Sequence, residues 1–322
     1  MKTAIVVHPD FDRTWPFVAD HLHGLLPTAT FTRLSAGETV ALPTVVADPG
    51  TVERLISLGV HPTDADLDGL PALAEAYVAG SWPPSEDVDE RLRRHNVRRI
   101  IHGSEGYWAQ SVAEYALGLT IGGLRRIPQQ HAAIVADDSP WRYTYGQFGD
   151  DPNFSHGTVS GKRVRIVGAG NIASRYASWT HMLGADVAAW DPYATEPSFH
   201  RSGARKVWHL DRLLADAEIF APMVPLLAST TGLITAEHIR ALPKGCLVVL
   251  VTRASVCDVP ELRRRVLADE LSLAADVFDV EPLPLDDPLL GRHNVVHTPH
   301  NAGRTMHANH SYAEMLAAQF AD

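Results

Sequence analysis

Three side chains that could share one reaction follow apolar, strand-like segments in the second half of the sequence: Arg253, Glu281 and His300. A guanidinium can bind a carboxylate through two parallel hydrogen bonds and polarise the carbonyl beside it. An imidazole can give or take a hydroxyl proton, and a carboxylate on its other nitrogen fixes its tautomer. Together they could support hydride transfer to a 2-oxo acid. Taken singly, each has a simpler interpretation: Arg253 as a surface cation, Glu281 as a turn residue and His300 as a loop residue.

A dinucleotide site is indicated by the segment Val-Arg-Ile-Val-Gly-Ala-Gly-Asn-Ile-Ala at 164–173. Alternating Val and Ile predict a strand, and Gly168 and Gly170 follow where a helix would begin. Gly168 can take the tight turn, and Gly170 lets the backbone approach a pyrophosphate. Asn171 and Ile172 open the helix, whose unpaired N–H groups attract an anion. Alone, this pattern is weak, because glycine-rich turns are common.

Asp191 strengthens the dinucleotide interpretation, because it ends the next expected strand, 185–191, roughly 20 residues after the glycines. Its carboxylate could accept hydrogen bonds from both ribose hydroxyls and would repel a 2′-phosphate, which favours NAD over NADP. The simpler alternative is a turn at Asp191-Pro192.

Alternating strands and helices must position these residues, which predicts an α/β protein with parallel sheets. In the first hundred residues we expect strands at 3–7, 29–34, 44–47, 75–79 and 97–102 and a helix at 11–26. After the glycine turn we expect strands at 219–223, 246–251, 272–276 and 294–297. Ligands of doubly wound sheets bind beyond the carboxyl ends of strands, where Arg253, Glu281 and His300 stand.

A long apolar helix is expected from Gln110 to Arg126, and a second stretch runs from Pro128 to about Ala136. So much apolar surface suggests that another subunit covers part of it. The alternative is packing against its own domain.

Composition narrows the class of protein. The chain has 322 residues, 45% of them hydrophobic and 20% charged, which allows two globular domains. A net charge of -10 argues against a nucleic-acid surface. Met1-Lys2 leads directly into a strand-like segment, and no apolar run approaches ~20 residues, so we expect no membrane segment.

Two cysteines, Cys246 and Cys257, make no disulfide framework and have no zinc spacing, which favours reduced thiols in a cytoplasm. The pairs His297-x-x-His300 and His307-x-x-His310 lack the spacing of a zinc protease, so we expect no metal.

Five motifs occur together in a fixed order: Gly168-x-Gly170-x-x-Ala173, Trp190-Asp191-Pro192, Thr252-Arg253 with Asp258, Asp276-Val277-Phe278-x-x-Glu281-Pro282, and Thr298-Pro299-His300-x-Ala302-Gly303. This order resembles the NAD-dependent D-2-hydroxyacid dehydrogenase family over about residues 95–305. Ser111-Val112-Ala113-Glu114 and Arg125-Arg126-Ile127-Pro128 also match.

The resemblance implies a catalytic set of Arg253, Glu281 and His300, with NAD as cofactor and a small acid as substrate. Cofactor contacts would come from the glycine turn, Asp191 and five further residues: Val224, Pro225, Thr252, Asp276 and Gly303. The substrate would meet Arg253 and the loop at Gly80 and Ser81, and His102 and Trp108 could border its pocket.

The family's chain path implies two domains. A flavodoxin-like substrate domain would comprise residues 1–104 and 300–322, and a Rossmann-type domain would comprise 105–299. A helical segment at 108–145 would make the homodimer contact.

Several positions depart from the family pattern: Trp108 replaces a usual Asn, and Met223, Leu250 and Ala254 replace commoner residues. The substrate is therefore not inferred from commoner members. A hydroxy- or oxo-phosphonate is an alternative substrate, and a corepressor-like, NAD-sensing scaffold without significant turnover is an alternative function.

Overall fold

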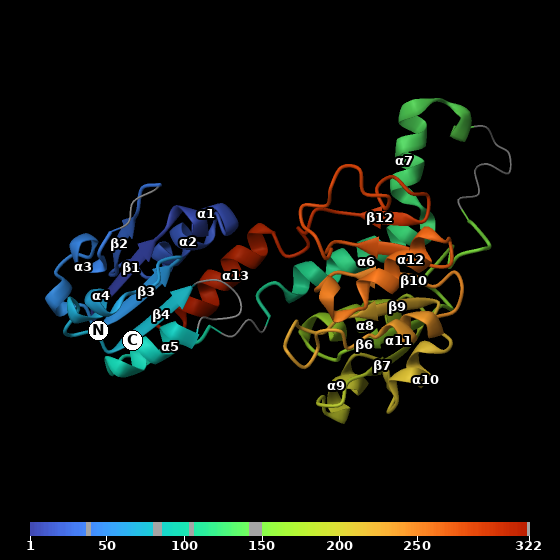
Figure 1. The fold of residues 1–322 in the computed structure, drawn as a ribbon. Helices are drawn as coiled ribbons and strands as arrows, with labels where there is room; N and C mark the ends of the chain where they lie inside the picture. The colour runs from blue at the N-terminus through green and yellow to red at the C-terminus, as the bar shows by residue number, and fades with distance from the viewer. Residues whose placement is uncertain (37–39, 80–85, 103–105, 142–149, 321–322) are drawn as a thin grey trace. The chain divides into compact units, whose positions relative to one another are not determined.

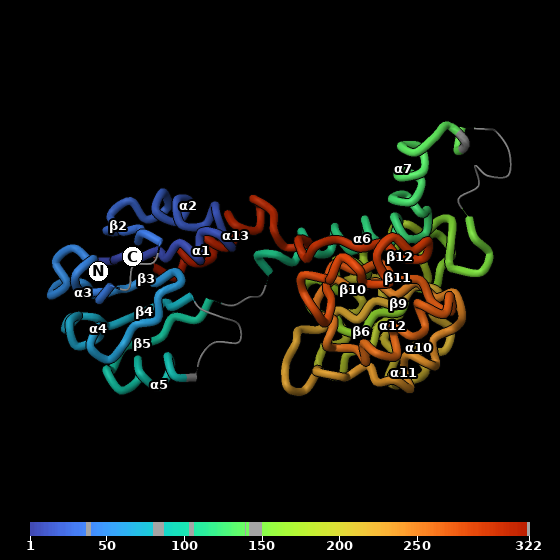
Figure 2. Tube along the Cα trace, turned by 45° about the horizontal axis from the view of Figure 1, so that its top comes forward, coloured from blue at the N-terminus to red at the C-terminus, as the bar shows by residue number. Residues whose placement is uncertain are grey.

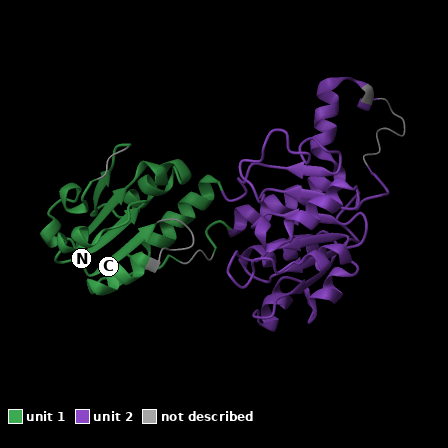
Figure 3. Cartoon of the chain, viewed as in Figure 1, with its two compact units in different colours: residues 1–108, 304–322 green, residues 109–303 purple. Residues whose placement is uncertain are grey.

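The computed structural model describes residues 1–36, 40–79, 86–102, 106–141 and 150–320. The chain divides into two compact units, residues 1–108 with 304–322 and residues 109–303 (Figure 3). The boundaries expected at 104/105 and 299/300 each lie four residues before those of the structure, which are at 108/109 and 303/304. The substrate-domain role of unit 1 stays a prediction.

Unit 1 is built on a parallel sheet in the order β2-β1-β3-β4-β5 (Figure 1). Its strands are β1 (Thr3–Val7), β2 (Thr30–Arg33), β3 (Arg54–Leu58), β4 (Glu75–Ala79) and β5 (Arg98–Arg99). Its helices are α1 (Pro9–Thr14), α2 (Val18–Leu25), α3 (Leu42–Val45), α4 (Asp64–Asp68), α5 (Glu86–Arg94) and α13 (Met306–Ala317), with a 3₁₀ turn at Pro49–Thr51. This strand order is that of flavodoxin-like folds, as expected.

Both faces of this sheet are buried. Along β1, Ile5 and Val7 join the core that includes Tyr312 of α13, whereas Ala4 and Val6 join the core on the opposite face. Because side chains alternate across a strand, the continuous apolar run Ala-Ile-Val-Val suits a strand covered on both sides. Helix α13 packs against α2, so the last segment of the chain belongs to unit 1.

Unit 2 is built on a parallel sheet in the order β12-β11-β10-β9-β6-β7-β8. Its strands are β6 (Arg163–Val167), β7 (Asp186–Trp190), β8 (Arg205–Lys206), β9 (Ile219–Pro222), β10 (Leu247–Leu250), β11 (Ser272–Ala275) and β12 (Val295–His297). Its helices are α6 (Ala109–Arg125), α7 (Ile127–Ala136), α8 (Asn171–Met182), α9 (Glu196–Arg201), α10 (Leu210–Leu214), α11 (Ala236–Ala241) and α12 (Val259–Leu267), with 3₁₀ turns at Ser139–Trp141 and Ala254–Val256. The order reverses between β6 and β9, which confirms the doubly wound Rossmann-type sheet.

Helices α6 and α7 differ in how they pack. Helix α6 lies against α8 and strands β10 and β11. Helix α7 extends away from the sheet of unit 2 in both ribbon and tube views, and no residue within it is buried (Figures 1 and 2). The two helices are joined at Arg126, whose backbone is left-handed with φ 52°.

Two expectations in unit 1 were wrong, and one strand was missed. The helix expected at 11–26 is broken into α1 and α2, because Pro16 cannot continue a helix and disfavours helical geometry at Trp15. The strand expected at 44–47 lies in and beyond the short helix α3, which has Pro43 in its first turn. Strand β3, which pairs with both β1 and β4, was not expected.

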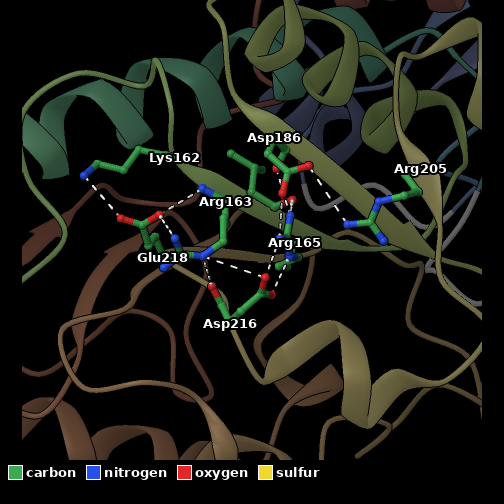
Figure 4. Close-up of polar contacts among 8 residues, drawn as sticks. Lys162, Arg163, Arg165, Asp186, Arg205, Asp216 and Glu218 are labelled. Carbon is green, nitrogen blue, oxygen red and sulfur yellow. Dashed lines mark hydrogen bonds and ion pairs between the residues drawn. The ribbon is translucent and has the colours of Figure 1, made fainter.

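A network of charges joins the amino ends of β6, β7 and β9 (Figure 4). Arg165 is 2% exposed, yet its guanidinium donates to Asp186 at 2.9 Å and, through two nitrogens, to Asp216 at 2.7 Å each. Arg163 forms ion pairs with Asp216 and Glu218. The hydrogen bonds from Arg165 lower the pKa of the Asp216 carboxyl below its usual value. This network lies at the amino ends of the strands, whereas the glycine turn follows the carboxyl end of β6.

Candidate active site

The glycine turn follows β6 and leads into α8. Gly168 has φ 109°, and a Cβ there would lie 2.7 Å from the carbonyl oxygen of Met223, so only glycine fits this turn. Gly170 is the N-cap of α8, and a Cβ there would meet nothing within 4 Å. Open space therefore lies at the first turn of a helix, where Asn171 and Ile172 present backbone N–H groups. This arrangement fits a pyrophosphate.

Asp191 lies at the end of β7 and ties that strand to the glycine turn. Its Oδ2 accepts a hydrogen bond from the backbone N–H of Ala169 at 2.9 Å, and its Oδ1 accepts from those of Tyr193 and Ala194 at 2.9 and 3.1 Å. A carboxylate held in this way keeps further lone pairs for ribose hydroxyls. Its contact with the cofactor stays a prediction.

Two further expected cofactor residues lie by the point where the strand order reverses. A Cβ at Gly168 would lie 3.2 Å from the Val224 side chain, so the segment after β9 reaches the glycine turn. The hydroxyl of the buried Thr252, after β10, donates to the carbonyl of Pro222 at 3.2 Å. The cofactor contacts of Val224, Pro225, Thr252 and Gly303 stay predictions.

His300 and Glu281 are in direct contact. The distance between His300 Nδ1 and Glu281 Oε2 is 2.6 Å, and the second carboxylate oxygen accepts from the backbone N–H of Phe278 at 2.8 Å. Their side chains are 39% and 34% exposed, so a substrate can reach them. The carboxylate therefore holds the imidazole by one nitrogen and leaves Nε2 for a reacting group.

Asp276 holds the segment that carries His300. Its carboxylate is fully buried and accepts from the Thr298 hydroxyl at 2.6 Å and from the backbone N–H groups of Asn301 and Ala302 at 3.1 and 2.8 Å. His300 itself has φ 52°, a left-handed conformation that costs energy in a non-glycine residue. Sequence reasoning did not identify this role of Asp276, although Thr298 and Asp276 end neighbouring strands. The expected cofactor contact of Asp276 stays a prediction.

Arg253 lies at the same edge of the sheet. It follows β10, whereas Glu281 and His300 follow β11 and β12, and these three strands are neighbours. Its guanidinium donates to the carbonyl of Thr252 at 2.7 Å. Within the described part of the chain, no hydrogen bond or ion pair joins Arg253 to either of the other two residues.

The expected substrate residues of unit 1 are only partly described. Gly80 and Ser81 lie outside the described residues. His102 Nε2 lies 3.0 Å from the carbonyl oxygen of Tyr312, and the Trp108 ring stacks on that of Trp15 at 6.2 Å between centroids. Trp15 and Tyr312 were not identified from the sequence, since both are far from Trp108 along the chain. The substrate contacts of His102 and Trp108 stay predictions.

Both cysteines are free and buried. Burial raises the pKa of the Cys257 thiol to about 12 and raises that of Cys246 as well. Among the described residues, no group of three or more His, Cys, Asp or Glu side chains is arranged to hold a metal ion. No helix in the described ranges is both long enough and apolar enough to cross a membrane.

The sequence is similar to those of two kinds of known dehydrogenase or reductase. The chain is 32% identical over 276 residues to a glyoxylate reductase from Thermofilum pendens, covering 82% of this chain and 76% of that protein. It is 29% identical over 208 residues to a D-3-phosphoglycerate dehydrogenase from Archaeoglobus fulgidus, covering 64% of this chain and 37% of that protein. The chain spans half or less of the length of this and two further phosphoglycerate dehydrogenases that it matches.

Among solved structures, D-mandelate dehydrogenase from Rhodotorula graminis has the same fold. The TM-score is 0.77 at 19% identity, and the match covers 99% of this chain and 93% of that one. Residues 117–302 match the family model described as "D-isomer specific 2-hydroxyacid dehydrogenase, NAD binding domain". Residues 117–302 therefore form an NAD-binding domain, and the chain belongs to the family of D-isomer-specific 2-hydroxyacid dehydrogenases.

Proposed function

We propose that the protein is an NAD-dependent oxidoreductase that transfers a hydride between nicotinamide and a small 2-hydroxy or 2-oxo acid. The observation that carries this proposal is the 2.6 Å contact between Glu281 and His300 beside an NAD-binding fold. When bound, NADH supplies the hydride to the carbonyl carbon of the acid. His300 supplies the proton to the carbonyl oxygen, so the products are the hydroxy acid and the oxidised cofactor.

Glu281 sets the proton chemistry of His300. In the proposed arrangement Nδ1–H of the imidazole donates to the Glu281 carboxylate, so Nε2 is the nitrogen that exchanges the proton with substrate. The carboxylate also stabilises the imidazolium form that donates the proton. This orientation depends on Asp276, which holds the backbone on the carboxyl side of His300.

Arg253 is the proposed carboxylate-binding residue. Its guanidinium keeps free N–H donors after the single bond to Thr252 O, and a fork of such donors matches a carboxylate. Unit 1 is the proposed substrate domain, with Gly80 and Ser81 among the proposed substrate contacts. The proposed location is the cytoplasm, where two free thiols remain reduced.

The proposed partner is a second copy of the chain, bound through the segment 108–145. Helix α7 carries no buried residue and exposes Ile127, Ile134 and Val135. An apolar helix that extends from the body of a domain is a surface that a second subunit covers.

The direct test follows NADH oxidation with a panel of 2-oxo acids and a parallel panel of oxo-phosphonates. We expect turnover with at least one 2-oxo acid. Turnover confined to oxo-phosphonates would favour the alternative substrate class. Bound NADH without turnover of either panel would contradict the enzymatic proposal and favour the NAD-sensing scaffold.

Glu281→Gln isolates the role of the carboxylate. We expect a fall of about 10²-fold in kcat, because a neutral amide assists proton transfer by the imidazole less than a carboxylate does. NADH affinity should stay within a factor of two, since Glu281 does not contact the glycine turn. An unchanged kcat would show that Glu281 does not assist His300.

A further inference from the structure

A second pocket lies in unit 2 at the amino ends of β10, β11 and β12. It has a cavity volume of about 20 Å³. A polar cavity of that size holds one or two waters, or one carboxylate-sized group. Arg253, Asp276 and His300 follow the carboxyl ends of the same strands. Because Ser272 begins β11 and Asp276 follows its last residue, the two sites lie about 13 Å apart along that strand.

The pocket contains buried polar atoms that have no hydrogen-bond partner. They are Ser272 Oγ, Gln129 Oε1 and His156 Nδ1. Ser272 is only 7% exposed. Buried polar groups in folded proteins are satisfied by protein, water or ligand, so three in one pocket indicate an occupant.

The orientation of Gln129 is determined by its own contacts. Its Nε2 faces three backbone carbonyls, those of Arg292, His293 and Val295, with the last at 2.9 Å. A carbonyl accepts but does not donate, so the amide nitrogen must be on this side and Oε1 on the other. Gln129 therefore offers an acceptor to the pocket.

Arg126 supplies a cation. Arg126 lines the pocket, and within the described residues no hydrogen bond or ion pair of its guanidinium is found. Its backbone is left-handed with φ 52°, at the junction that turns α6 into α7. A non-glycine residue in this conformation is held there by its surroundings. Arg126 and Ser272 therefore line the same pocket.

We propose that this pocket binds a small carboxylate that carries a hydroxyl or ammonium group on the adjoining carbon. The carboxylate accepts from Arg126 and from the Ser272 hydroxyl, and the neighbouring group donates to Gln129 Oε1. His156 Nδ1, which lies 3.6 Å from Asp150, provides a further polar contact. Arg126, Ser272 Oγ and Gln129 Oε1 then each have a partner of the opposite kind, which an inorganic anion without a donor would not provide.

The test measures binding of glycolate, glycine and acetate to the full chain by calorimetry and by thermal shift. It is done with the Arg253→Ala variant, so that the probes do not bind at the proposed substrate site. We expect glycolate or glycine to bind more tightly than acetate, and the preferred probe identifies the donor as hydroxyl or ammonium. Equal binding of acetate overturns the assignment of Gln129, and loss of all binding in this background shows that the ligand occupies the substrate site instead.

Two variants and one control locate the ligand. Arg126→Gln and Ser272→Ala should each weaken binding at least ten-fold, whereas Arg125→Gln, the exposed neighbour at the end of α6, should not change it. Without ligand, Ser272→Ala should keep or raise the Tm, because it removes a hydroxyl that has no partner. Binding that survives both pocket variants, or no binding by any probe, overturns the proposal.

Discussion

At the scale of single residues, the backbone around His300 matters as much as its side chain. Asp276 accepts three hydrogen bonds from the segment Thr298–Ala302, and one of them comes from the Thr298 hydroxyl. Thr298→Val keeps the shape of the side chain but removes this donor. We expect kcat to fall about ten-fold, the equivalent of one hydrogen bond to a charged group of ~1.4 kcal/mol.

Thr298→Ser is the matched control, because it keeps the hydroxyl and loses only a methyl group. Steady-state kinetics of the two variants separate the hydrogen bond from packing. Equal rates in both would show that the Asp276 contact does not position His300.

The thiols give a second prediction at this scale. Burial raises the pKa of Cys257 to about 12, and Cys246 is also raised, so neither forms a thiolate near neutral pH. A thiol-reactive dye should label neither of the two cysteines in the folded protein and both after unfolding. Rapid labelling of the native chain would contradict this burial.

At the scale of elements, the two glycines of the β6–α8 turn have different functions. Gly168→Ala would place a Cβ 2.7 Å from Met223 O on a backbone with φ 109°. We therefore expect the free energy of unfolding to fall by about 2 kcal/mol. Gly170→Ala meets no neighbour, so stability should change by no more than about 0.5 kcal/mol.

Gly170→Ala, which should hardly change stability, should instead weaken cofactor binding. The methyl group of Gly170→Ala enters the space that a pyrophosphate would use, so NADH affinity should fall at least ten-fold in a fully folded protein. Fluorescence titration and chemical unfolding measure the two effects. Normal NADH affinity in Gly170→Ala would place the pyrophosphate elsewhere.

The charge network at the opposite edge predicts a pH dependence of stability. The pKa of Asp216 is lowered in the folded state, so its pairing with Arg165 stabilises the protein above the usual Asp pKa and is lost as the pH falls through the lowered value. Asp216→Asn should lower the free energy of unfolding by about 1 to 2 kcal/mol at pH 7. The effect is no larger because the Asp216 side chain is 49% exposed and solvent screens the pair.

The difference between wild type and Asp216→Asn should shrink as the pH is lowered below about 4, where the wild-type carboxyl also becomes protonated. Urea unfolding between pH 7 and pH 3 measures it. Asp211→Asn is the control and should have little effect, because the Asp211 side chain, which pairs with His238, is 88% exposed. A constant difference over the whole pH range would contradict this account.

At the scale of the whole molecule, helix α7 predicts self-association. Val135 is 74% exposed on a helix without buried residues, and Val135→Glu would put a charge into any apolar contact made there. We expect a dimer for the wild type and a monomer for Val135→Glu in sedimentation experiments. Met182→Glu is the control, because Met182 is also 74% exposed but ends α8. A monomeric wild type would contradict the proposed dimer.

Much of unit 2 could be predicted from the sequence because its signals are local. The strand, the two glycines and the helix start occupy one short stretch, and Asp191 follows at a characteristic spacing. Unit 1 was harder. Strand β3 has no motif after it, and the short helix α3 was mistaken for a strand because Val45 and Val46 favour extended structure in isolation.

The sequence by itself determined the fold class, the cofactor motif and the order of the three proposed catalytic residues, since each depends on neighbouring residues or on strands that end in the same direction. Only the tertiary structure decided that Asp276 holds the His300 segment, that Arg165 is buried between Asp186 and Asp216, and that Gln129 and Ser272 share a pocket with Arg126. Apart from Gln129 and Arg126, which are three positions apart, these contacts join residues from 21 to 146 positions apart. No local pattern encodes them, because they form only when separate strands and helices pack into one sheet.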